Sequence, residues 1–478
     1  MKILMCTSES TPLAKSGGLA DVVHALSQEL IKQKNEVIII MPFFKSIKNK
    51  NFKFELVDRI FVQVSWRNQE CAIYKTIIDG ITYILLDNAR YFDRDNLYGY
   101  MDDTERFALL SSAIRTVIKH IGFKPDIIHC HDWHVGMVPT LIKEQNANDP
   151  FYKDIKYVLT IHNPAFKGVF NPYILGDMYG LDEEVFSSGR IRFQGQVSTL
   201  KAAIMYCDKV TTVSPTHAEE LLSFESVHDL QEVLKFRKDD FIGILNGIDY
   251  IEFDPLNDKS IIQNYDLLSF EKGKELNKKD VLELFNLKDE NRPLFGMVSR
   301  LTWQKGLDLV INACRHVLEN GGNVVILGSG EYNYEQELEK LRAQYPDHMG
   351  IYIGYSDEIA HKIYAGADFF FMPSLFEPCG IGQMISLRYG TLPIVRLTGG
   401  LKDTIYPLDD RNIDIANGFG FFDYDNNAMI SQTSLALETY KDKLIMKKLI
   451  NNAMSCINNW EKSTKEYIKL YKEAQKKK

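Results

Sequence analysis

One segment of the sequence brings a carboxylate, a proline and two glycines to a point where a strand is expected to lead into a helix. It runs from Ser374 to Gln383 and follows the apolar stretch 369–372, which we predict to be a buried strand. Because the first N–H groups of a helix are unpaired and lie at the positive end of its dipole, such a turn suits anionic or hydroxyl-rich ligands. Its carboxylate, Glu377, can accept hydrogen bonds from sugar hydroxyls or answer positive charge at an anomeric carbon. A purely structural strand–turn–helix is the alternative.

A lysine precedes two adjacent glycines near the N-terminus. Lys15 is followed by Gly17 and Gly18. They lie between the expected strand 3–6 and the first expected helix, which we predict to begin after Asp21. Lysine is a point charge suited to phosphate oxygens at a helix N-terminus, so we interpret Lys15 as a phosphate ligand. The spacing is not that of a Walker loop, and a solvated loop lysine is the alternative.

Two cations open the second half of the chain. Arg300 and Lys305 follow the expected strand 294–299, and Gly306 leads into a helix. Ligands of open α/β sheets bind outside the carboxyl ends of the strands. We therefore predict that the two cations clamp a diphosphate, with solvation or pairing to nearby acids as the alternative.

Histidines follow two other expected strands. Residues 129–134 read His-Cys-His-Asp-Trp-His, and His162-Asn163 follows the strand 157–161. A zinc site is disfavoured because the spacing is cramped and a second set of ligands with metal-like spacing is missing. We predict substrate-facing loops, in which His162 and Asn163 donate to a sugar or an oxyanion. Satisfied structural histidines are the alternative.

Three weaker signals remain. Asp-x-Asp triplets occur at 93–95 and 423–425, a pattern that holds a cation in metal-dependent sugar-nucleotide enzymes but is also frequent by chance. Asn246 and Gly247 form either a simple turn or a hinge that also touches ligand. We predict neither a metal ion nor a cofactor.

Apolar runs of strand length alternate with longer amphipathic segments along the whole chain. In the first half these runs are 3–6, 37–41, 81–86, 127–130, 157–161, 210–213 and 241–245, and in the second half 294–299, 324–327, 351–353, 369–372 and 394–395. Near-continuous apolar strands between helices predict parallel sheets with both faces covered.

The expected fold is α/β, with two doubly wound, Rossmann-like domains facing a deep cleft. A chain of 478 residues is too long for one ordinary core. Turn formers in 246–258 indicate a linker, so we place the first domain at 1–245 and the second at 246–455. A final amphipathic helix near 460–475 is predicted to be a packing helix.

Composition narrows the class of partner. The net charge of −8 disfavours nucleic acid, and we find no run of 18 or more apolar residues that could span a membrane. Seven scattered cysteines fit a reducing compartment rather than a disulfide framework. The N-terminus lacks the pattern of a signal peptide, so we expect a cytoplasmic protein.

Taken in order along the chain, the motifs resemble those of the bacterial glycogen synthase and plant starch synthase family. The matching segments are Lys15–Leu19, His131–His134, Ile161–Asn163, Thr212–Thr216, Leu245–Asp249, Ser299–Thr302, Gln304–Asp308, Phe376–Gly380, Tyr389–Pro393 and Thr398–Leu401. The resemblance implies a retaining glycosyltransferase of GT-B architecture. It would transfer glucose from ADP-glucose to the non-reducing end of an α-1,4-glucan, either glycogen or a maltooligosaccharide. Residues 456–478 would return to the first domain.

The same resemblance implies roles for individual residues. The catalytic residues would be Glu377, His162, Arg300 and Lys305, with the two cations compensating the leaving ADP. The donor would be bound by Lys15, Gly17, Gly18, Asp21, Asn246, Gln304, Tyr355, Cys379, Gly380, Ile381 and Gly382. The acceptor would contact Asp132, His134 and Tyr98.

The sequence departs from the family's usual motifs in three places. After Cys379-Gly380 the family usually has Leu-Thr-Gln or Leu-Asn-Gln, whereas Ile381-Gly382-Gln383 lacks that side-chain hydrogen-bonding group. Residues 192–198 differ from the usual wording, and 223–235 lack the glycine-rich stretch normally found before Arg237. We expect the first departure to alter the donor pocket and the other two to affect acceptor contacts.

Three other functions are alternatives to this interpretation. The nearest is another retaining GT-B glycosyltransferase that uses UDP-glucose or makes a different glycan. A catalytically silent glucan-binding or regulatory protein is disfavoured because Lys15, Arg300, Lys305 and Glu377 are all present. An oxidoreductase is disfavoured because a complete G-x-G-x-x-G fingerprint is missing.

Overall fold

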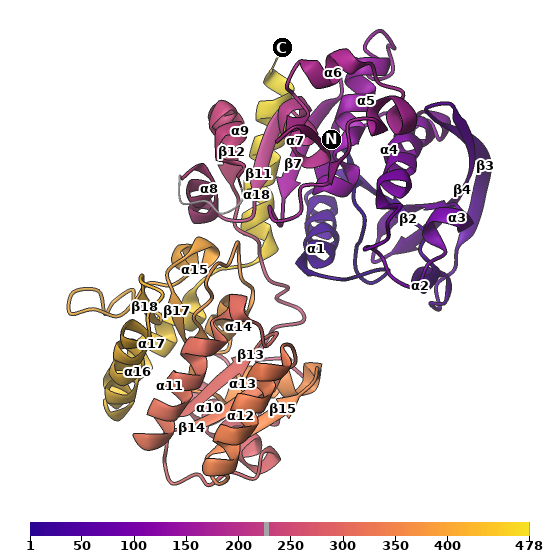
Figure 1. Ribbon diagram of the computed structural model, residues 1–478. Helices are drawn as coiled ribbons and strands as arrows, with labels where there is room; N and C mark the ends of the chain where they lie inside the picture. Colours follow the sequence, from indigo (N-terminus) through magenta and orange to yellow (C-terminus); the bar gives the residue numbers. More distant parts are fainter. Residues whose placement is uncertain (224–228, 478) are drawn as a thin grey trace. The chain divides into compact units, whose positions relative to one another are not determined.

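The computed structural model describes residues 1–223 and 229–477 and divides into two compact α/β units (Figure 1). Unit 1 comprises Met1–Val213, Ala218–Ile244 and Trp460–Lys478, and unit 2 comprises Ser214–His217 and Leu245–Asn459. The prediction of two α/β units with parallel sheets is confirmed. Within the described ranges, no helix is both long enough and apolar enough to cross a membrane.

Unit 1 is built on a nine-stranded sheet with the order β12-β11-β7-β6-β1-β2-β5-β4-β3. Its strands are β1 (Lys2–Cys6), β2 (Glu36–Pro42), β3 (Glu55–Val64), β4 (Arg67–Ile78), β5 (Ile81–Asp87), β6 (Ile127–His131), β7 (Lys156–Ile161), β11 (Lys209–Thr212) and β12 (Phe241–Gly243). Every strand predicted in this half is present, and these strands pair in parallel. The register sets Ile3 beside Val37 on one side and beside Ile127 on the other.

This sheet is mixed rather than parallel throughout, which corrects the prediction. Strands β3 and β4 form an antiparallel hairpin at one edge, and β4 also pairs antiparallel with β5. Most side chains of β3 are exposed, and the first four residues of β4 alternate between half-buried and exposed positions. A strand with one face in water needs no continuous apolar run, so these two strands lack the signal that predicts the others.

Two groups of helices pack in unit 1: α1 contacts α18, while α4 contacts α5, which in turn contacts α7. The α-helices before the linker are α1 (Gly18–Lys32), α2 (Lys45–Lys48), α3 (Ala89–Phe92), α4 (Asp103–His120), α5 (Met137–Gln145), α6 (Glu183–Ser187), α7 (Thr199–Tyr206), α8 (Pro215–Leu222) and α9 (Gln231–Phe236). Short helices of other types are η1 (Trp133–Val135), η2 (Leu175–Tyr179) and η3 (Lys238–Asp240).

Helix α1 begins earlier than predicted. It starts at Gly18 rather than after Asp21, with Gly17 as an extended N-cap residue, so Asp21 lies in the first turn. A carboxylate in the first turn is stabilised by the positive end of the helix dipole. The buried face of α1 includes Leu19, Val22 and Leu26, which recur at helical spacing.

The structure describes all of one segment that departs from the family sequence, 192–198, and only part of the other, 223–235. The first forms the hairpin of β9 (Arg192–Phe193) and β10 (Gln196–Ser198), which pairs with β8 (Val169–Phe170) in a small second sheet. Gln194 and Gly195 both have positive φ, as the tight turn between such short strands requires. The second departure falls partly on 224–228, which lie outside the described residues.

The final helix, α18 (Trp460–Lys476), packs in the core of unit 1. Its buried side chains include Trp460, Leu470 and Tyr471, and it contacts α1 and β7. The prediction of a packing helix with this apolar spacing is confirmed. The chain therefore contributes its last residues to the unit in which it begins.

Unit 2 contains a six-stranded, fully parallel sheet with the order β15-β14-β13-β16-β17-β18. Its strands are β13 (Leu294–Val298), β14 (Asn323–Gly328), β15 (Met349–Ile353), β16 (Phe369–Met372), β17 (Leu392–Arg396) and β18 (Phe419–Phe421). Its helices are α10 (Phe270–Leu284), η4 (Trp303–Lys305), α11 (Leu307–Glu319), α12 (Tyr332–Gln344), α13 (Asp357–Gly366), α14 (Gly382–Arg388), α15 (Gly399–Thr404), α16 (Asn426–Lys441) and α17 (Lys443–Ser455). Only β18 was not predicted, because its apolar run is short.

The predicted linker, 246–258, contains neither helix nor strand. It is nevertheless packed onto unit 2, with Asn246 and Ile248 buried and Ile248 bridged to Asn459. At its far end, Asp258 accepts a hydrogen bond from Tyr389 and pairs with His361. The segment 246–258 is therefore held against unit 2 by its own contacts.

Replacing Leu470 by alanine should lower the free energy of unfolding of unit 1 by about 2–5 kcal/mol, because the buried leucine would leave a cavity. Urea unfolding is followed by tryptophan fluorescence in a Trp303→Phe background. The remaining tryptophans, Trp66, Trp133 and Trp460, all lie in unit 1, so the signal then reports that unit.

The matched control is Lys472→Ala on the exposed face of the same helix. It should change the free energy of unfolding by less than about 0.5 kcal/mol. Equal, small effects of the two substitutions would contradict the packing of α18 into this core.

Candidate functional site

In each unit the strand order places the first strand beside the strand to which the chain later returns. In unit 1 these neighbours are β1 and β6, and in unit 2 they are β13 and β16. The loops after such a pair run to opposite sides, and ligands of doubly wound sheets bind at this switch point. Most of the predicted site residues lie on loops after β1, β6 and β7 in unit 1 and after β13 and β16 in unit 2.

In unit 2 the predicted carboxylate and one predicted cation form an ion pair. Lys305 Nζ donates to Glu377 Oε2 at 2.5 Å, and Ser374 Oγ donates to the same oxygen at 2.9 Å. The side chains of Glu377 and Lys305 are only 9% and 16% exposed. Losing either partner would leave a charge without compensation and largely out of water. Arg300, on the loop that precedes Lys305, is exposed.

The predicted strand–turn–helix around Glu377 is confirmed. Strand β16 ends at Met372, and α14 begins at Gly382 with Ile381 as its N-cap residue. Between them Gly380 has a φ of +73°, a conformation that residues with a side chain rarely adopt. The two glycines noted in the sequence therefore stand at the turn and at the first residue of the helix.

Two glycines of α15 contact the Glu377 loop closely. A Cβ on Gly399 would lie 2.0 Å from the carbonyl oxygen of Glu377, and one on Gly400 would lie 2.0 Å from that of Cys379. Gly400 N donates to the Glu377 carbonyl oxygen at 3.2 Å. The loop that carries the carboxylate is thus held by backbone contacts that only glycine permits.

The other residues predicted for the donor in unit 2 differ in exposure. Cys379 is buried, which raises the pKa of its thiol to about 12 and makes it a neutral group rather than a nucleophile. Gln304 Nε2 donates to the carbonyl oxygen of Phe376 at 3.3 Å and so ties two loops together. Asn246 is buried, and its Oδ1 lacks a hydrogen-bond partner among the described residues. Tyr355 is 80% exposed.

In unit 1 two carboxylates hold the Lys15 loop. Lys15 Nζ lies 2.8 Å from Asp21 Oδ2, and Ser16 N donates to Glu9 Oε2 at 2.5 Å. Glu9 is 3% exposed, and burial raises the pKa of its carboxyl above the usual value. Glu9 was not among the predicted site residues, although it follows β1 just as the others follow their strands. That position was the signal that could have found it.

Asp132 has a backbone conformation that residues with a side chain rarely adopt. Its φ is +60° and its ψ is −174°, and its Oδ1 accepts hydrogen bonds from the backbone N–H groups of His162 at 2.8 Å and Asn163 at 3.5 Å. Strain of this kind persists only where the surroundings impose it and clusters at functional sites. Burial raises the pKa of the Asp132 carboxyl to about 7, although the two N–H groups lower it.

The histidines near Asp132 are neutral rings. Burial lowers the pKa of His129 and of His134 to about 3, and the surrounding protein lowers that of the partly exposed His162 to about 3 as well. These rings therefore offer hydrogen bonds rather than positive charge at neutral pH. Across the described residues, no cluster of three or more His, Cys, Asp and Glu side chains could hold a metal ion.

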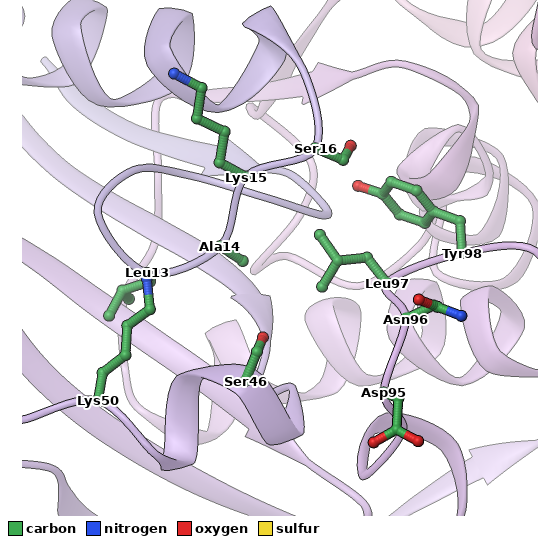
Figure 2. A pocket seen from close by; sticks show the side chains of 10 residues that line it. All are labelled: Leu13, Ala14, Lys15, Ser16, Ser46, Lys50, Asp95, Asn96, Leu97 and Tyr98. Atoms are coloured by element: carbon green, nitrogen blue, oxygen red, sulfur yellow. The ribbon is translucent and has the colours of Figure 1, made fainter. Parts of the chain in front are cut away.

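A cavity of about 480 Å³ opens beside the Lys15 loop of unit 1 (Figure 2). Its lining comprises Leu13, Ala14, Lys15, Ser16, Ser46, Lys50, Asp95, Asn96, Leu97 and Tyr98. In Figure 2 the Tyr98 hydroxyl points toward Ser16, whereas the Lys15 side chain extends away from Tyr98. The Tyr98 ring stacks on His134 with centroids 4.5 Å apart, and its hydroxyl lies 2.8 Å from Ser8 Oγ. Two of the three predicted acceptor residues are thus in contact.

The two units present different chemistry. Unit 2 offers two cations and a buried carboxylate at one switch point. This combination suits a sugar bonded to an anionic leaving group. Unit 1 offers neutral histidines, two buried carboxyl groups and an open cavity with an aromatic ring, which suit a hydroxyl-rich ligand. It also offers the half-exposed Lys15, which suits phosphate oxygens. Of the predicted residues, the structure brings together Lys305 with Glu377 in unit 2. In unit 1 it brings together three pairs, which are Lys15 with Asp21, Tyr98 with His134, and His162 with Asp132.

Two family models match the chain. Residues 2–236 match the starch synthase catalytic domain, and residues 279–454 match glycosyl transferases group 1. Together they cover parts of both units and leave the final helix outside.

Curated relatives match the chain over nearly its full length. A glycogen synthase from Clostridium perfringens is 43% identical over 480 aligned residues, covering 99% of this chain and 98% of the relative. A glycogen synthase from Bacillus anthracis is 44% identical over 474 residues, covering 99% of both.

Solved structures share the fold. The catalytic domain of starch synthase IV from Arabidopsis thaliana, bound to ADP and acarbose, has a TM-score of 0.89 and 32% identity over 100% of this chain and 99% of its own. A sucrose-phosphate synthase from Thermosynechococcus elongatus has a TM-score of 0.61 at 16% identity over 99% and 98% of the two chains, which shows likeness of fold alone.

We expect Asp132→Asn to stabilise unit 1 increasingly as the pH rises. The folded-state pKa of Asp132, about 7, lies above the ordinary value of 3.8. Stabilisation by the protonated form is therefore complete below pH 3.8 and is lost as the pH rises through 7. Asparagine keeps the accepting oxygen and cannot ionise. Between pH 5 and pH 8 the unfolding free energy of the variant should rise by about 2.5 kcal/mol relative to the wild type.

The measurement is urea unfolding of unit 1 at several pH values, again by tryptophan fluorescence with Trp303→Phe. Asp154→Asn, at an exposed position of the same unit, is the control and should show no such trend. A difference between wild type and Asp132→Asn that does not change with pH would contradict the raised pKa.

Proposed function

Because the chain belongs to the glycogen and starch synthase family of glycosyltransferases, we propose that it transfers glucose from ADP-glucose to the non-reducing end of an α-1,4-glucan, with retention of configuration. Its fold is the GT-B fold of that family. The observation that carries the proposal is the buried ion pair of Lys305 and Glu377 at the switch point of unit 2. A cation and a carboxylate held together there match the two charges that glucosyl transfer from a nucleotide sugar develops.

We assign Arg300 and Lys305 to the diphosphate. As the bond between the anomeric carbon and the diphosphate breaks, negative charge grows on the leaving group and positive charge grows on the sugar. Fixed cations stabilise the leaving group without having to reorganise. Lys305 is already positioned by Glu377, and Arg300 is exposed and can meet the ligand without breaking a buried contact.

We assign Glu377 to the sugar. Its second oxygen, Oε1, is not the one that receives the hydrogen bonds of Lys305 and Ser374, which both go to Oε2. Oε1 can therefore accept from a sugar hydroxyl or face the developing positive charge. The role assigned to this carboxylate is to orient the sugar and to stabilise it electrostatically.

We assign His162 and the Lys15 loop of unit 1 to the donor as well. His162 is a neutral imidazole and suits a sugar hydroxyl, and Lys15 with Gly17 and Gly18 suits phosphate oxygens. Asp21 pairs with Lys15 and would have to yield part of that contact to a phosphate. The remaining donor residues, Asn246, Gln304, Tyr355 and the turn 379–382, are carried over from the family resemblance.

We assign the acceptor to the surroundings of Tyr98, His134 and Asp132. The exposed edge of the cavity in unit 1 presents an aromatic ring together with hydroxyl and amide groups, a combination that binds the apolar faces and hydroxyls of a glucan (Figure 2). We propose glycogen or a maltooligosaccharide as the acceptor and expect neither nucleic acid nor membrane as a partner. Action in the cytoplasm likewise stays a prediction.

The test is chain extension. The purified chain is incubated with a maltooligosaccharide primer and either ADP-glucose or UDP-glucose, and product lengths are followed. We expect extension with ADP-glucose. Extension only with UDP-glucose would keep the reaction and overturn the donor. No extension by folded protein with either donor would overturn the proposed function.

Glu377→Ala should lower the rate of transfer by at least about 100-fold while leaving donor binding largely intact, because the lost group acts on charge that develops in the transition state. The rate is measured in the same assay, and donor binding by calorimetry. Glu377→Gln guards against loss of folding, since it keeps the size of the side chain beside Lys305. Glu337→Ala, at an exposed position of α12, should leave both quantities unchanged. Near-normal turnover in both Glu377 variants would remove this residue from the catalytic set.

A further inference from the structure

Next to His162 lies a buried histidine to which the proposed function gives no role. His131 is fully buried at the end of β6, and its Nδ1 lies 2.9 Å from His162 Nε2. Its other nitrogen, Nε2, is also buried and lacks a hydrogen-bond partner among the described residues. Buried polar atoms without partners are uncommon, so this one needs a physical reason.

The lack of a partner at His131 Nε2 indicates which of the two rings donates the hydrogen bond between His131 and His162. A neutral imidazole carries one proton, on one of its two nitrogens. If His162 donated, the proton of His131 would lie on Nε2 as a buried N–H with no acceptor. If His131 donates from Nδ1, its Nε2 is an unprotonated acceptor, and buried acceptors without partners are less rare than buried N–H groups without partners. The hydrogen bond therefore runs from His131 Nδ1–H to His162 Nε2.

The ring of His131 is held in this orientation. It packs on His129 with ring centroids 4.2 Å apart. Both nitrogens of His129 are engaged in turn, Nδ1 with the Tyr471 hydroxyl at 2.8 Å and Nε2 with Thr160 Oγ1 at 2.7 Å. Burial lowers the pKa of His131 well below its usual value and that of His162 to about 3, so neither ring gains a second proton at neutral pH.

The direction of this hydrogen bond determines which ring nitrogen of His162 carries the proton. With Nε2 accepting, the single proton of His162 lies on Nδ1. Within the part of the chain that the structure describes, this nitrogen has no hydrogen-bond partner. The main chain of His162 is fixed as well, because its N–H donates to Asp132 Oδ1 at 2.8 Å.

We propose that His131 is a positioning residue that holds His162 in the Nδ1–H tautomer, so that His162 presents a hydrogen-bond donor to an accepting oxygen of the donor sugar. The identity of the ligand rests on the proposed function, whereas the tautomer does not. With the opposite tautomer, the nitrogen that faces the ligand would carry a lone pair. A sugar hydroxyl could then bind only by turning its own proton toward His162, which would remove that proton from any other acceptor.

The tautomer can be read directly. In the full-length chain labelled with ¹⁵N-histidine, long-range ¹H–¹⁵N correlation spectra distinguish the protonated from the bare ring nitrogen of each of the 11 histidines. His162→Gln identifies the signals of His162. We expect Nδ1–H at both His131 and His162 in the wild type. His131→Leu should release His162 into the Nε2–H form or a mixture, whereas His131→Asn, whose amide can donate from a similar position, should retain Nδ1–H.

His129→Asn is the matched control, because it removes the neighbouring ring but leaves the hydrogen bond between His131 and His162 in place. It should leave the tautomer of His162 unchanged. In the extension assay, His131→Leu should lower kcat/KM by about 10-fold, and His131→Asn should recover most of that loss.

Two results would overturn the proposal. One is Nε2–H at His162 in the wild type, and the other is Nδ1–H that persists in His131→Leu. The wild-type spectrum decides the matter even if His131→Leu fails to fold. The expected tautomers in a chain that transfers no glucose would support the role of His131 in fixing the ring and count against the proposed function instead.

Discussion

The order of the parallel strands constrains where this chain can bind a ligand. In each unit, β1 beside β6 or β13 beside β16, two neighbouring strands end together while their loops run apart. Backbone groups beyond the last ladder hydrogen bonds are left for loops, helix ends and ligands. The residues assigned to catalysis follow from this: Glu377 comes after β16, Arg300 and Lys305 come after β13, and His162 comes after β7 at the same edge of its sheet.

Burial affects the charge of the side chains at these sites through desolvation. Lys305 and Glu377 lie within ion-pair distance of each other and are largely removed from water. The Asp132 carboxyl accepts hydrogen bonds from the backbone N–H groups of His162 and Asn163, which lower its pKa. Desolvation outweighs them and raises this pKa to about 7. Burial lowers the pKa of His129 and of His131, so these two rings are neutral hydrogen-bond donors and acceptors at neutral pH. The site in unit 2 therefore rests on an ion pair, whereas desolvation makes the histidines of unit 1 neutral and raises the pKa of Asp132.

Much of this arrangement was predictable where the signal is local. Buried parallel strands are continuous apolar runs, and every one of the predicted runs became a strand. The loop residues that follow them, such as Lys15 and Glu377, could be picked by type and position. The hairpin of β3 and β4 was missed because one of its faces is exposed, and the start of α1 was placed too late because a glycine N-cap carries no polar side chain. Glu9 was missed because it belongs to no motif, and only its position after β1 indicates a role at the site.

The sequence by itself determined which chemical groups stand at the ends of which strands, because strand and helix signals depend on neighbours a few residues away. Only the tertiary structure decided which of these groups meet. Lys305 and Glu377 are 72 residues apart in the chain, and His129 and Tyr471 are 342 apart, yet each pair is within hydrogen-bond distance. Tautomers, protonation states and the close approach of Gly400 to Cys379 all depend on such long-range contacts. A local pattern cannot encode them, because burial is a property of the whole packed unit.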